Sequence, residues 1–120
     1  VNRFWMETRS ASGLKLLGAK TSPFKLARIL KKGGVLALLI DQHMPEGRGI
    51  PVPFFGRPAS TTHAPAVLAL TTGAALLPVS VERLAGGRHR LRVEPELALR
   101  RDAARGAEIE RITLELNRWL

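Results

Sequence analysis

The sequence predicts a single domain of the α/β class. Residues 35–40 form a short, unbroken apolar run, which is typical of a strand covered on both faces. A predicted helix lies within 61–73, and a second apolar run follows at 75–83, so the order is strand, helix, strand. The length of 120 residues suits one domain, and 45% hydrophobic with 24% charged residues is the composition of a folded chain.

The first clear helix is predicted at 23–32. Ser22 is a candidate N-cap, and Pro23 suits the first helical position because its missing amide proton would have no partner there. Gly33 can adopt the left-handed conformation that ends many helices. An apolar stripe runs along one side of this helix: Leu26, Ile29 and Leu30.

The predicted strand at 35–40 ends at Asp41 and Gln42, and a long stretch without periodicity follows. This stretch is rich in Gly, Pro and Arg, and it carries two adjacent phenylalanines in a hairpin-like excursion within 52–61. Loops of this length in compact domains are usually functional or disordered. Ligands of open α/β sheets collect beyond the carboxyl ends of the strands. The sequence therefore favours a site at Asp41 and Gln42.

Two strands and a helix are predicted after this loop. Thr61 or Thr62 can cap the helix that ends at Gly73, and the run at 75–83 is predicted as a second buried strand. Residues 88–95 alternate strictly and should pair antiparallel with that strand. One face of the alternating segment has Leu91 and Val93, and the other has Arg88, Arg90 and Arg92.

The C-terminal segment, 107–120, predicts an amphipathic helix with an apolar side formed by Ile109, Ile112, Leu116 and Trp119. Its pattern continues without a stop signal, and the chain begins at Val1, so we expect a segment truncated at both ends. No signal peptide is visible. Residues 58–81 carry no charged side chain, yet prolines and a Thr-Thr-Gly break divide them into a helix, a turn and a strand rather than a membrane span.

The net charge of +9 favours an anionic partner, such as nucleic acid, an anionic membrane or an acidic protein. A basic nucleic-acid-binding module is one interpretation. RNA-binding platforms interleave aromatic residues with arginines on a sheet, whereas the paired phenylalanines here lie in a Pro- and Gly-rich loop, so we expect no nucleic-acid partner. The absence of cysteine excludes a disulfide framework and a thiol nucleophile and fits a cytosolic setting. No metal-binding cluster is evident.

Several blocks together resemble a known family. They are ETRSASG, LLIDQ, VPFFGRPAST, ALTTGAALLPVSVER and GGRHRLRVEPEL. Their order and spacing are similar to the lipid A biosynthesis (late) acyltransferases, which are related to glycerolipid acyltransferases. The resemblance implies a glycerolipid-acyltransferase-like domain with a mixed, mostly parallel sheet flanked by helices. Residues 1–120 would be the C-terminal part of a single acyltransferase domain.

The resemblance also implies an activity. Such enzymes transfer a fatty acyl chain from the thioester of acyl carrier protein to a hydroxyl of a lipid A precursor or another anionic lipid. They act on the anionic cytoplasmic face of the inner membrane, with an N-terminal anchor that would lie outside this chain. The family's general base is a histidine with an acid five positions later, in a block that should precede Arg9. The fragment itself would then be inactive, no cofactor is implied, and a lipid-binding relative without activity is the alternative.

Two positions match functional residues of that family. Arg9 matches an arginine that would hold a phosphate of the acceptor or of the carrier's prosthetic arm. Asp41 matches an aspartate that would order a neighbouring arginine or orient the acceptor. We predict supporting catalytic roles for both, against the structural alternatives of a solvated arginine and an acid that caps a loop.

The substrate-binding residues implied by the same blocks are Gln42, Phe54, Phe55, Gly56, Arg57 and Thr61. The two phenylalanines and the glycine would line an acyl-chain groove, or the rings would be core beneath the loop. The arginine would bind phosphate or lie on the surface, and the threonine would contact substrate or cap a helix. Ala64 stands where the family often has glycine, which argues against a close backbone contact there.

The histidines of the chain do not supply the missing base. His89 and Glu94 have the required spacing, but they lie on the alternating strand, where positions five apart point to opposite faces. His43 and His63 have no acid at that spacing. The arginines at 88, 90 and 92 discourage edge-to-edge pairing and promote solubility, or alternatively dock anionic headgroups or the acidic carrier protein.

Overall fold

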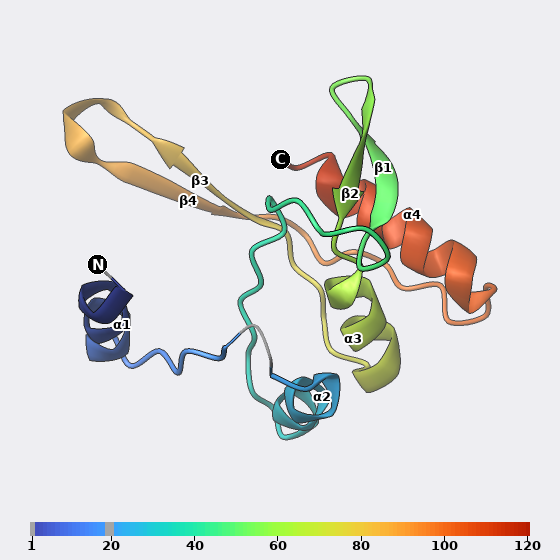
Figure 1. Ribbon diagram of the computed structural model, residues 1–120, viewed down its shortest axis with the longest axis horizontal. Coiled ribbons are helices and arrows are strands. Elements are labelled where there is room, and N and C mark those ends of the chain that lie inside the picture. The colour runs from blue at the N-terminus through green and yellow to red at the C-terminus, as the bar shows by residue number, and fades with distance from the viewer. Residues whose placement is uncertain (1, 19–20) are drawn as a thin grey trace.

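The computed structural model describes residues 2–18 and 21–120. Within these residues the chain forms four helices, four strands and one short 3₁₀ turn (Figure 1). The helices are α1 (Asn2–Ala11), α2 (Pro23–Lys31), α3 (Ala64–Thr72) and α4 (Arg105–Asn117). The strands are β1 (Ile50–Phe54), β2 (Arg57–Thr61), β3 (Val79–Arg83) and β4 (His89–Val93), and the turn is Ala85–Gly87.

The strands pair as two separate antiparallel hairpins. β1 pairs with β2 from Ile50 opposite Thr61 to Phe54 opposite Arg57. β3 pairs with β4 from Val79 opposite Val93 to Arg83 opposite His89. The chain is therefore mixed α/β, as predicted, but the mostly parallel sheet is not observed in the described residues.

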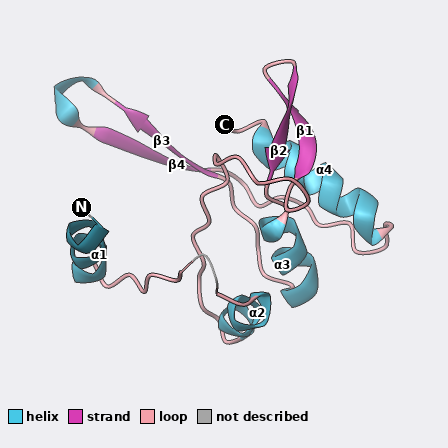
Figure 2. Cartoon of the chain, viewed as in Figure 1, coloured by secondary structure: helices cyan, strands magenta, loops and turns pink. Residues whose placement is uncertain are grey.

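The predicted strand at 35–40 is wrong, and this is why the parallel sheet is missing. The segment runs as irregular backbone between α2 and the hairpin β1–β2 (Figure 2). Val35 is 92% exposed and Leu39 is 72% exposed, while Ile40 packs against the core. An apolar run becomes a buried strand only when neighbouring strands satisfy its backbone and helices cover both faces. In the part of the chain that the structure describes, no strand pairs with residues 35–40, and most of their side chains are exposed.

The core lies between α3, α4 and the segment after β4. Its buried members are Ala66, Leu97, Ile112 and Leu116, and the partly buried side chains packed against them are Ile40, Leu70, Leu76, Leu99 and Ile109. Figure 1 shows α1 and the β3–β4 ribbon standing away from the cluster of α2, α3, α4 and the β1–β2 hairpin. The radius of gyration is 15.6 Å, against about 14 Å for a compact domain of this length. The fold is accordingly more extended than a typical domain.

The local helix signals are mostly confirmed. The Oγ atom of Ser22 accepts a hydrogen bond from the backbone amide of Lys25 at 3.3 Å, and Pro23 opens α2. Gly33 follows the helix with a φ of 77°. Gly73 ends α3 in the left-handed conformation.

The predicted N-cap of α3 is wrong. His63 occupies that position without a side-chain capping bond. Thr61 instead ends β2, where it is buried and donates its hydroxyl to the carbonyl of Ala59 at 3.2 Å. Thr62 lies one residue before the cap, and its Oγ1 accepts from the amide of Ala64 at 3.3 Å. Because the backbone of Thr61 pairs with Ile50 in the β1–β2 hairpin, the N-cap position of α3 falls in the connection after β2.

The β3–β4 ribbon confirms the predicted antiparallel pairing, but its first strand is not buried. Val79 and Val81 are each more than half exposed, as are their partners Val93 and Leu91. On the other face, Glu82 forms ion pairs of 3.3 Å with Arg90 and Arg92. Exposed pairs of this kind contribute little to stability.

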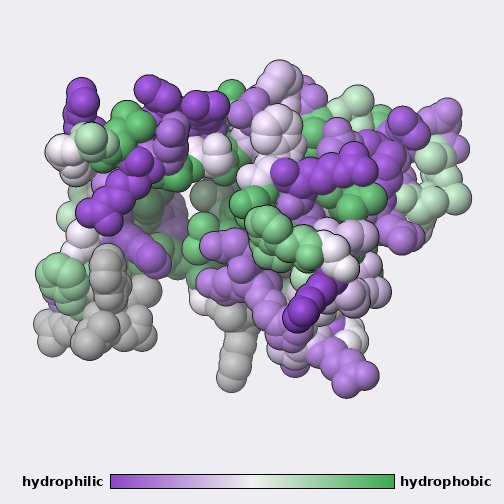
Figure 3. Space-filling model, turned by 90° about the horizontal axis from the view of Figure 1, so that it is seen from above, coloured by the Kyte–Doolittle hydropathy of each residue, from purple (hydrophilic) through white to green (hydrophobic). Residues whose placement is uncertain are grey.

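The surface shows the same incomplete burial. Figure 3 shows hydrophobic side chains exposed between hydrophilic ones across the face viewed from above. Large exposed side chains include Phe24, Val35 and Phe55. In the part of the chain that the structure describes, no helix has both the length and the apolar character to cross a bilayer. Within residues 58–81 the predicted helix and strand are present as α3 and the start of β3, but β3 begins at Val79 rather than at 75, and most of the strand β2 was not predicted there.

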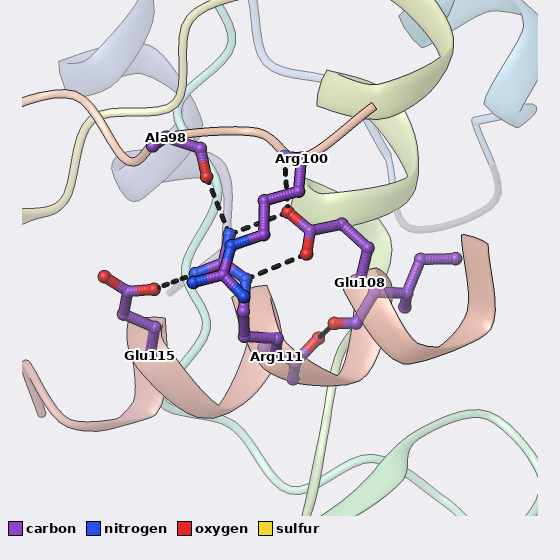
Figure 4. A network of polar contacts seen from close by, with 7 residues as sticks. Ala98, Arg100, Glu108, Arg111 and Glu115 are labelled. Carbon is purple, nitrogen blue, oxygen red and sulfur yellow. Dashed lines mark hydrogen bonds and ion pairs between the residues drawn. The ribbon is translucent and has the colours of Figure 1, made fainter. Parts of the chain in front are cut away.

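A polar network attaches α4 to the segment that precedes it. The carboxylate of Glu108, which is 2% exposed, accepts two hydrogen bonds from Arg111, at 2.7 and 2.8 Å (Figure 4). It also accepts the backbone amide of Arg100 at 2.8 Å. Arg111 donates in turn to the carbonyl of Ala98 at 2.6 Å and forms an ion pair with Glu115. The hydrogen bond from Arg111 is the main cause that holds the pKa of Glu108 at about 2, with the Arg100 amide adding to it and burial opposing it.

Candidate active site

A pocket of about 390 Å³ lies where three segments meet: residues 40–43, the β1–β2 hairpin, and the end of α4 with the residues that follow it. We call it the Asp41 pocket. It is open to solvent and is lined by Ile40, Asp41, Gln42, His43, Phe54, Ala59, Ser60, Thr61, Asn117 and Leu120. Four of the residues predicted from the sequence come together here, namely Asp41, Gln42, Phe54 and Thr61.

Backbone hydrogen bonds and one buried amide hold the walls of this pocket. The amide of Met44 donates to the carbonyl of Ser60 at 2.9 Å, which ties the segment after Asp41 to β2. The side-chain amide of Asn117, 5% exposed, donates to the carbonyl of Pro53 at 3.0 Å and so ties α4 to β1. Gly49 allows the close approach, because a Cβ atom there would lie 2.5 Å from the Oγ atom of Ser60.

The lining combines polar and apolar groups. A carboxylate, two amides, an imidazole and two hydroxyls provide hydrogen-bonding groups, from Asp41, Gln42, Asn117, His43, Ser60 and Thr61. Ile40, Phe54 and Leu120 provide apolar surface in the same pocket. A pocket with apolar walls and a few polar groups suits a ligand that has an alkyl chain and a polar end.

The two phenylalanines have different environments, which follow from the turn between β1 and β2. Phe55 and Gly56 are the turn residues, with φ values of 47° and 75°, as a two-residue type I′ hairpin requires. Phe55 is 90% exposed at the tip, and its ring meets that of Phe54 edge-on with centroids 4.7 Å apart. Phe54 lines the pocket, whereas Phe55, Gly56 and Arg57 do not. Phe55 is not core beneath the loop.

Replacing Phe55 by Asn should raise the free energy of unfolding by about 0.5 kcal/mol. Relief of the left-handed strain contributes about 1 kcal/mol, and loss of the exposed ring contact removes about half of that gain. Chemical denaturation of the two proteins measures the difference. Phe55→Ala is the matched control, because it loses the same ring without tolerating the left-handed conformation, and it should be less stable than Phe55→Asn. Equal stability of the two variants would show that strain at Phe55 is unimportant.

Arg9 is not brought to the Asp41 pocket. It lies exposed in the last turn of α1, a helix that stands apart in Figure 1, and it does not line the pocket. The supporting role of Arg9 stays a prediction from the family resemblance alone.

The histidines lie in three separate places. His43 lines the Asp41 pocket, His89 begins β4 at the exposed end of the ribbon, and His63 precedes α3. The Nδ1 atom of His63 is buried and has no hydrogen-bond partner among the residues that the structure describes. Across residues 2–18 and 21–120, no group of acidic and histidine side chains is arranged to hold a metal ion.

Sequence reasoning missed several lining residues, of which Asn117 and Ser60 are the most informative. Asn117 follows Leu116 on the buried side of α4, and a polar residue at the edge of an apolar stripe needs a partner when buried. The position of Asn117 beside the apolar stripe of α4 was therefore the one sequence signal that could have indicated a buried, hydrogen-bonded side chain. Nothing in the local sequence distinguishes Ser60, because its place in the pocket depends on the register of the hairpin.

Comparison with known proteins identifies the family of the chain. No match is found among curated proteins. A family model described as bacterial lipid A biosynthesis acyltransferase matches residues 1–120, which is the full length of the sequence. This agrees with the resemblance of the five sequence blocks. The chain belongs to the bacterial lipid A biosynthesis acyltransferase family.

Proposed function

We propose that this protein transfers a fatty acyl chain from acyl carrier protein to a hydroxyl of a lipid A precursor, and that the Asp41 pocket holds the reacting groups. Family membership supports acyl transfer to a lipid A-like acceptor in general. The observation that carries the assignment to this pocket is the meeting of Asp41 and Gln42 with the apolar side chains of Phe54 and Ile40 in one concavity.

The reaction joins the acceptor hydroxyl oxygen to the acyl carbonyl carbon and breaks the carbon–sulfur bond of the thioester. The hydroxyl proton leaves through a general base, and the thiol of the carrier arm departs with a proton. In this proposal Asp41 accepts a hydrogen bond from the acceptor hydroxyl and orients it for attack. The base is the upstream histidine–acid pair that the resemblance implies. Phe54 and Ile40 contact the acyl chain.

The donor and the location belong to the same proposal. A net charge of +9 favours association with an anionic membrane surface and with an acidic carrier protein. Both attract a basic protein electrostatically at separations of up to about one Debye length. We place the enzyme on the cytoplasmic side of the inner membrane.

Acyl transfer by the protein as it occurs in the cell tests the proposal. The purified enzyme is incubated with a lipid A precursor and either acyl carrier protein thioester or the corresponding coenzyme A thioester. Mass spectrometry should show a gain of one acyl ester, formed faster from the carrier-bound donor. Equal rates would reject the carrier as the preferred donor. Binding of the lipid without any product would favour the inactive lipid-binding relative instead.

A further inference from the structure

A second pocket lies near the N-terminal end of α4, whereas the Asp41 pocket lies at its C-terminal end. It has a volume of about 130 Å³ and is lined by Leu70, Arg100, Arg101, Ala103, Arg105 and Glu108. We call it the arginine pocket. Three arginines and one glutamate give its lining a formal charge of +2. Glu108 and Asn117, which line the two pockets, are nine residues apart, or about 14 Å along a helix axis.

Apart from an electrostatic interaction between Arg100 and Glu108, no carboxylate in the described part of the chain is paired with the arginines of this pocket. Glu108 is already engaged by Arg111 and by the amide of Arg100. Arg105 donates to the neutral hydroxyl of Thr71 at 2.6 Å. Within residues 2–18 and 21–120, no ion pair of Arg100, Arg101 or Arg105 is formed.

Arg101 also has a neutral neighbour. Its guanidinium lies beside Gly73, 3.3 Å from the point where a Cβ atom would stand, at the C-terminal end of α3. The partial negative charge of a helix end attracts a cation, but it amounts to about half an elementary charge. Arg111, by contrast, contacts two full carboxylates, those of Glu108 and Glu115. The arginines of the pocket are therefore available to a fully charged anion.

We propose that the arginine pocket binds a phosphate group, carried either by a lipid headgroup or by a soluble phosphate compound. Guanidinium groups offer paired N–H donors that match the oxygens of a phosphate. The side chains of Leu70 and Ala103 add apolar wall beside the charged groups. Because the two pockets do not share a lining residue, a phosphate bound here leaves the Asp41 pocket open.

Equilibrium binding by the complete protein tests this inference without requiring acyl transfer. Two probes are used: inorganic phosphate, followed by calorimetry, and phosphatidylcholine vesicles with or without phosphatidic acid, followed by co-sedimentation. The double variant Arg101→Gln, Arg105→Gln should bind about tenfold or more weakly, since it loses charge-assisted hydrogen bonds. If the variant loses affinity only for the vesicles, the bound phosphate belongs to a lipid headgroup. If it loses affinity equally for both probes, the pocket recognises the phosphate group alone.

The matched control is Arg28→Gln with Arg83→Gln, which removes the same charge from exposed positions that line neither pocket. It should retain affinity within about twofold. Equal weakening by both pairs would show diffuse attraction and overturn the inference, as would a wild-type protein that binds neither probe. The double variant Arg101→Lys, Arg105→Lys keeps the charge but loses the paired N–H donors. Its affinity for the probes should therefore lie between that of the wild type and that of the Gln pair, and this comparison remains informative even if the Gln pair is poorly folded.

Discussion

Replacing Asp41 by Asn is expected to lower the rate of acyl transfer by about a hundredfold or more, with little change in stability. The side chain is exposed in the pocket wall, so the nearly isosteric amide should not disturb packing. The amide loses the negative charge that strengthens a hydrogen bond to the acceptor hydroxyl, and positioned polar groups of this kind typically contribute factors of this size. Initial rates of product formation, measured by mass spectrometry with matched enzyme concentrations, give the comparison.

The control for this prediction is Glu46→Gln. Glu46 is an exposed acid in the same loop that does not line the pocket, so its loss should leave the rate nearly unchanged. A near-normal rate for Asp41→Asn would remove the assignment of this pocket to the reaction. Unfolding curves of both variants separate a catalytic effect from a loss of folded protein.

Arg9→Ala, in the same assay, separates the family resemblance from the geometry. The resemblance predicts a large loss of rate, although Arg9 lies on α1 and outside the pocket. A large loss would require that α1 approach the reaction centre during turnover. A normal rate would remove the functional role of Arg9 and leave that of Asp41 untouched.

Features encoded by neighbouring residues were predictable from the sequence. Ser22 and Pro23 start a helix through a capping bond and a fixed φ angle, and Gly73 ends one through its left-handed conformation. The alternation at 88–95 predicted β4 and its antiparallel partner, since period two is a property of the strand itself. These signals act over a few residues and need no distant partner.

Features that depend on distant partners were not predictable in the same way. The run at 35–40 has the composition of a buried strand, but Val35 and Leu39 remain exposed, and no strand of the described residues pairs with the segment. The helix α1 was not predicted, because residues 7–20 carry only a weak pattern. Mostly apolar sequence establishes that a segment can be buried, and tertiary contacts decide whether it is.

The candidate site shows the same division. Asp41 and Gln42 were singled out by their place after an apolar run, and they do line a pocket although that run is not a strand. Separating Phe54 from Phe55 required the turn type, since Phe-Gly lacks the Asn-Gly signature of a type I′ hairpin. Asn117 lines the pocket from α4 and bonds to Pro53, which is 64 positions earlier in the sequence. No local sequence pattern indicates a contact over that separation.

The second large effect is expected at Glu108, where Glu108→Gln should lower the free energy of unfolding by about 3 kcal/mol at neutral pH. The substitution keeps an oxygen for the amide of Arg100 but removes the charge that faces Arg111. Breaking a buried ion pair costs about 3–5 kcal/mol, and partial exposure of Arg111 with its second partner Glu115 places this case at the low end. Chemical denaturation measures the loss, and Glu110→Gln, an exposed acid on the same helix, is the matched control.

The pH dependence of stability distinguishes the ion pair from simple packing at Glu108. Hydrogen bonds from Arg111 and the Arg100 amide lower the pKa of the folded-state carboxyl from 4.5 to about 2. A depressed folded-state pKa means that the stabilisation is complete above 4.5 and is lost as the pH falls toward 2, because the unfolded chain takes up the proton first. The gap in stability between Glu110→Gln and Glu108→Gln should therefore narrow across that interval. A gap that stays constant from neutral pH to pH 2 would mean that the cost of Glu108→Gln comes from packing, and that the carboxylate charge does not hold α4 to the preceding segment.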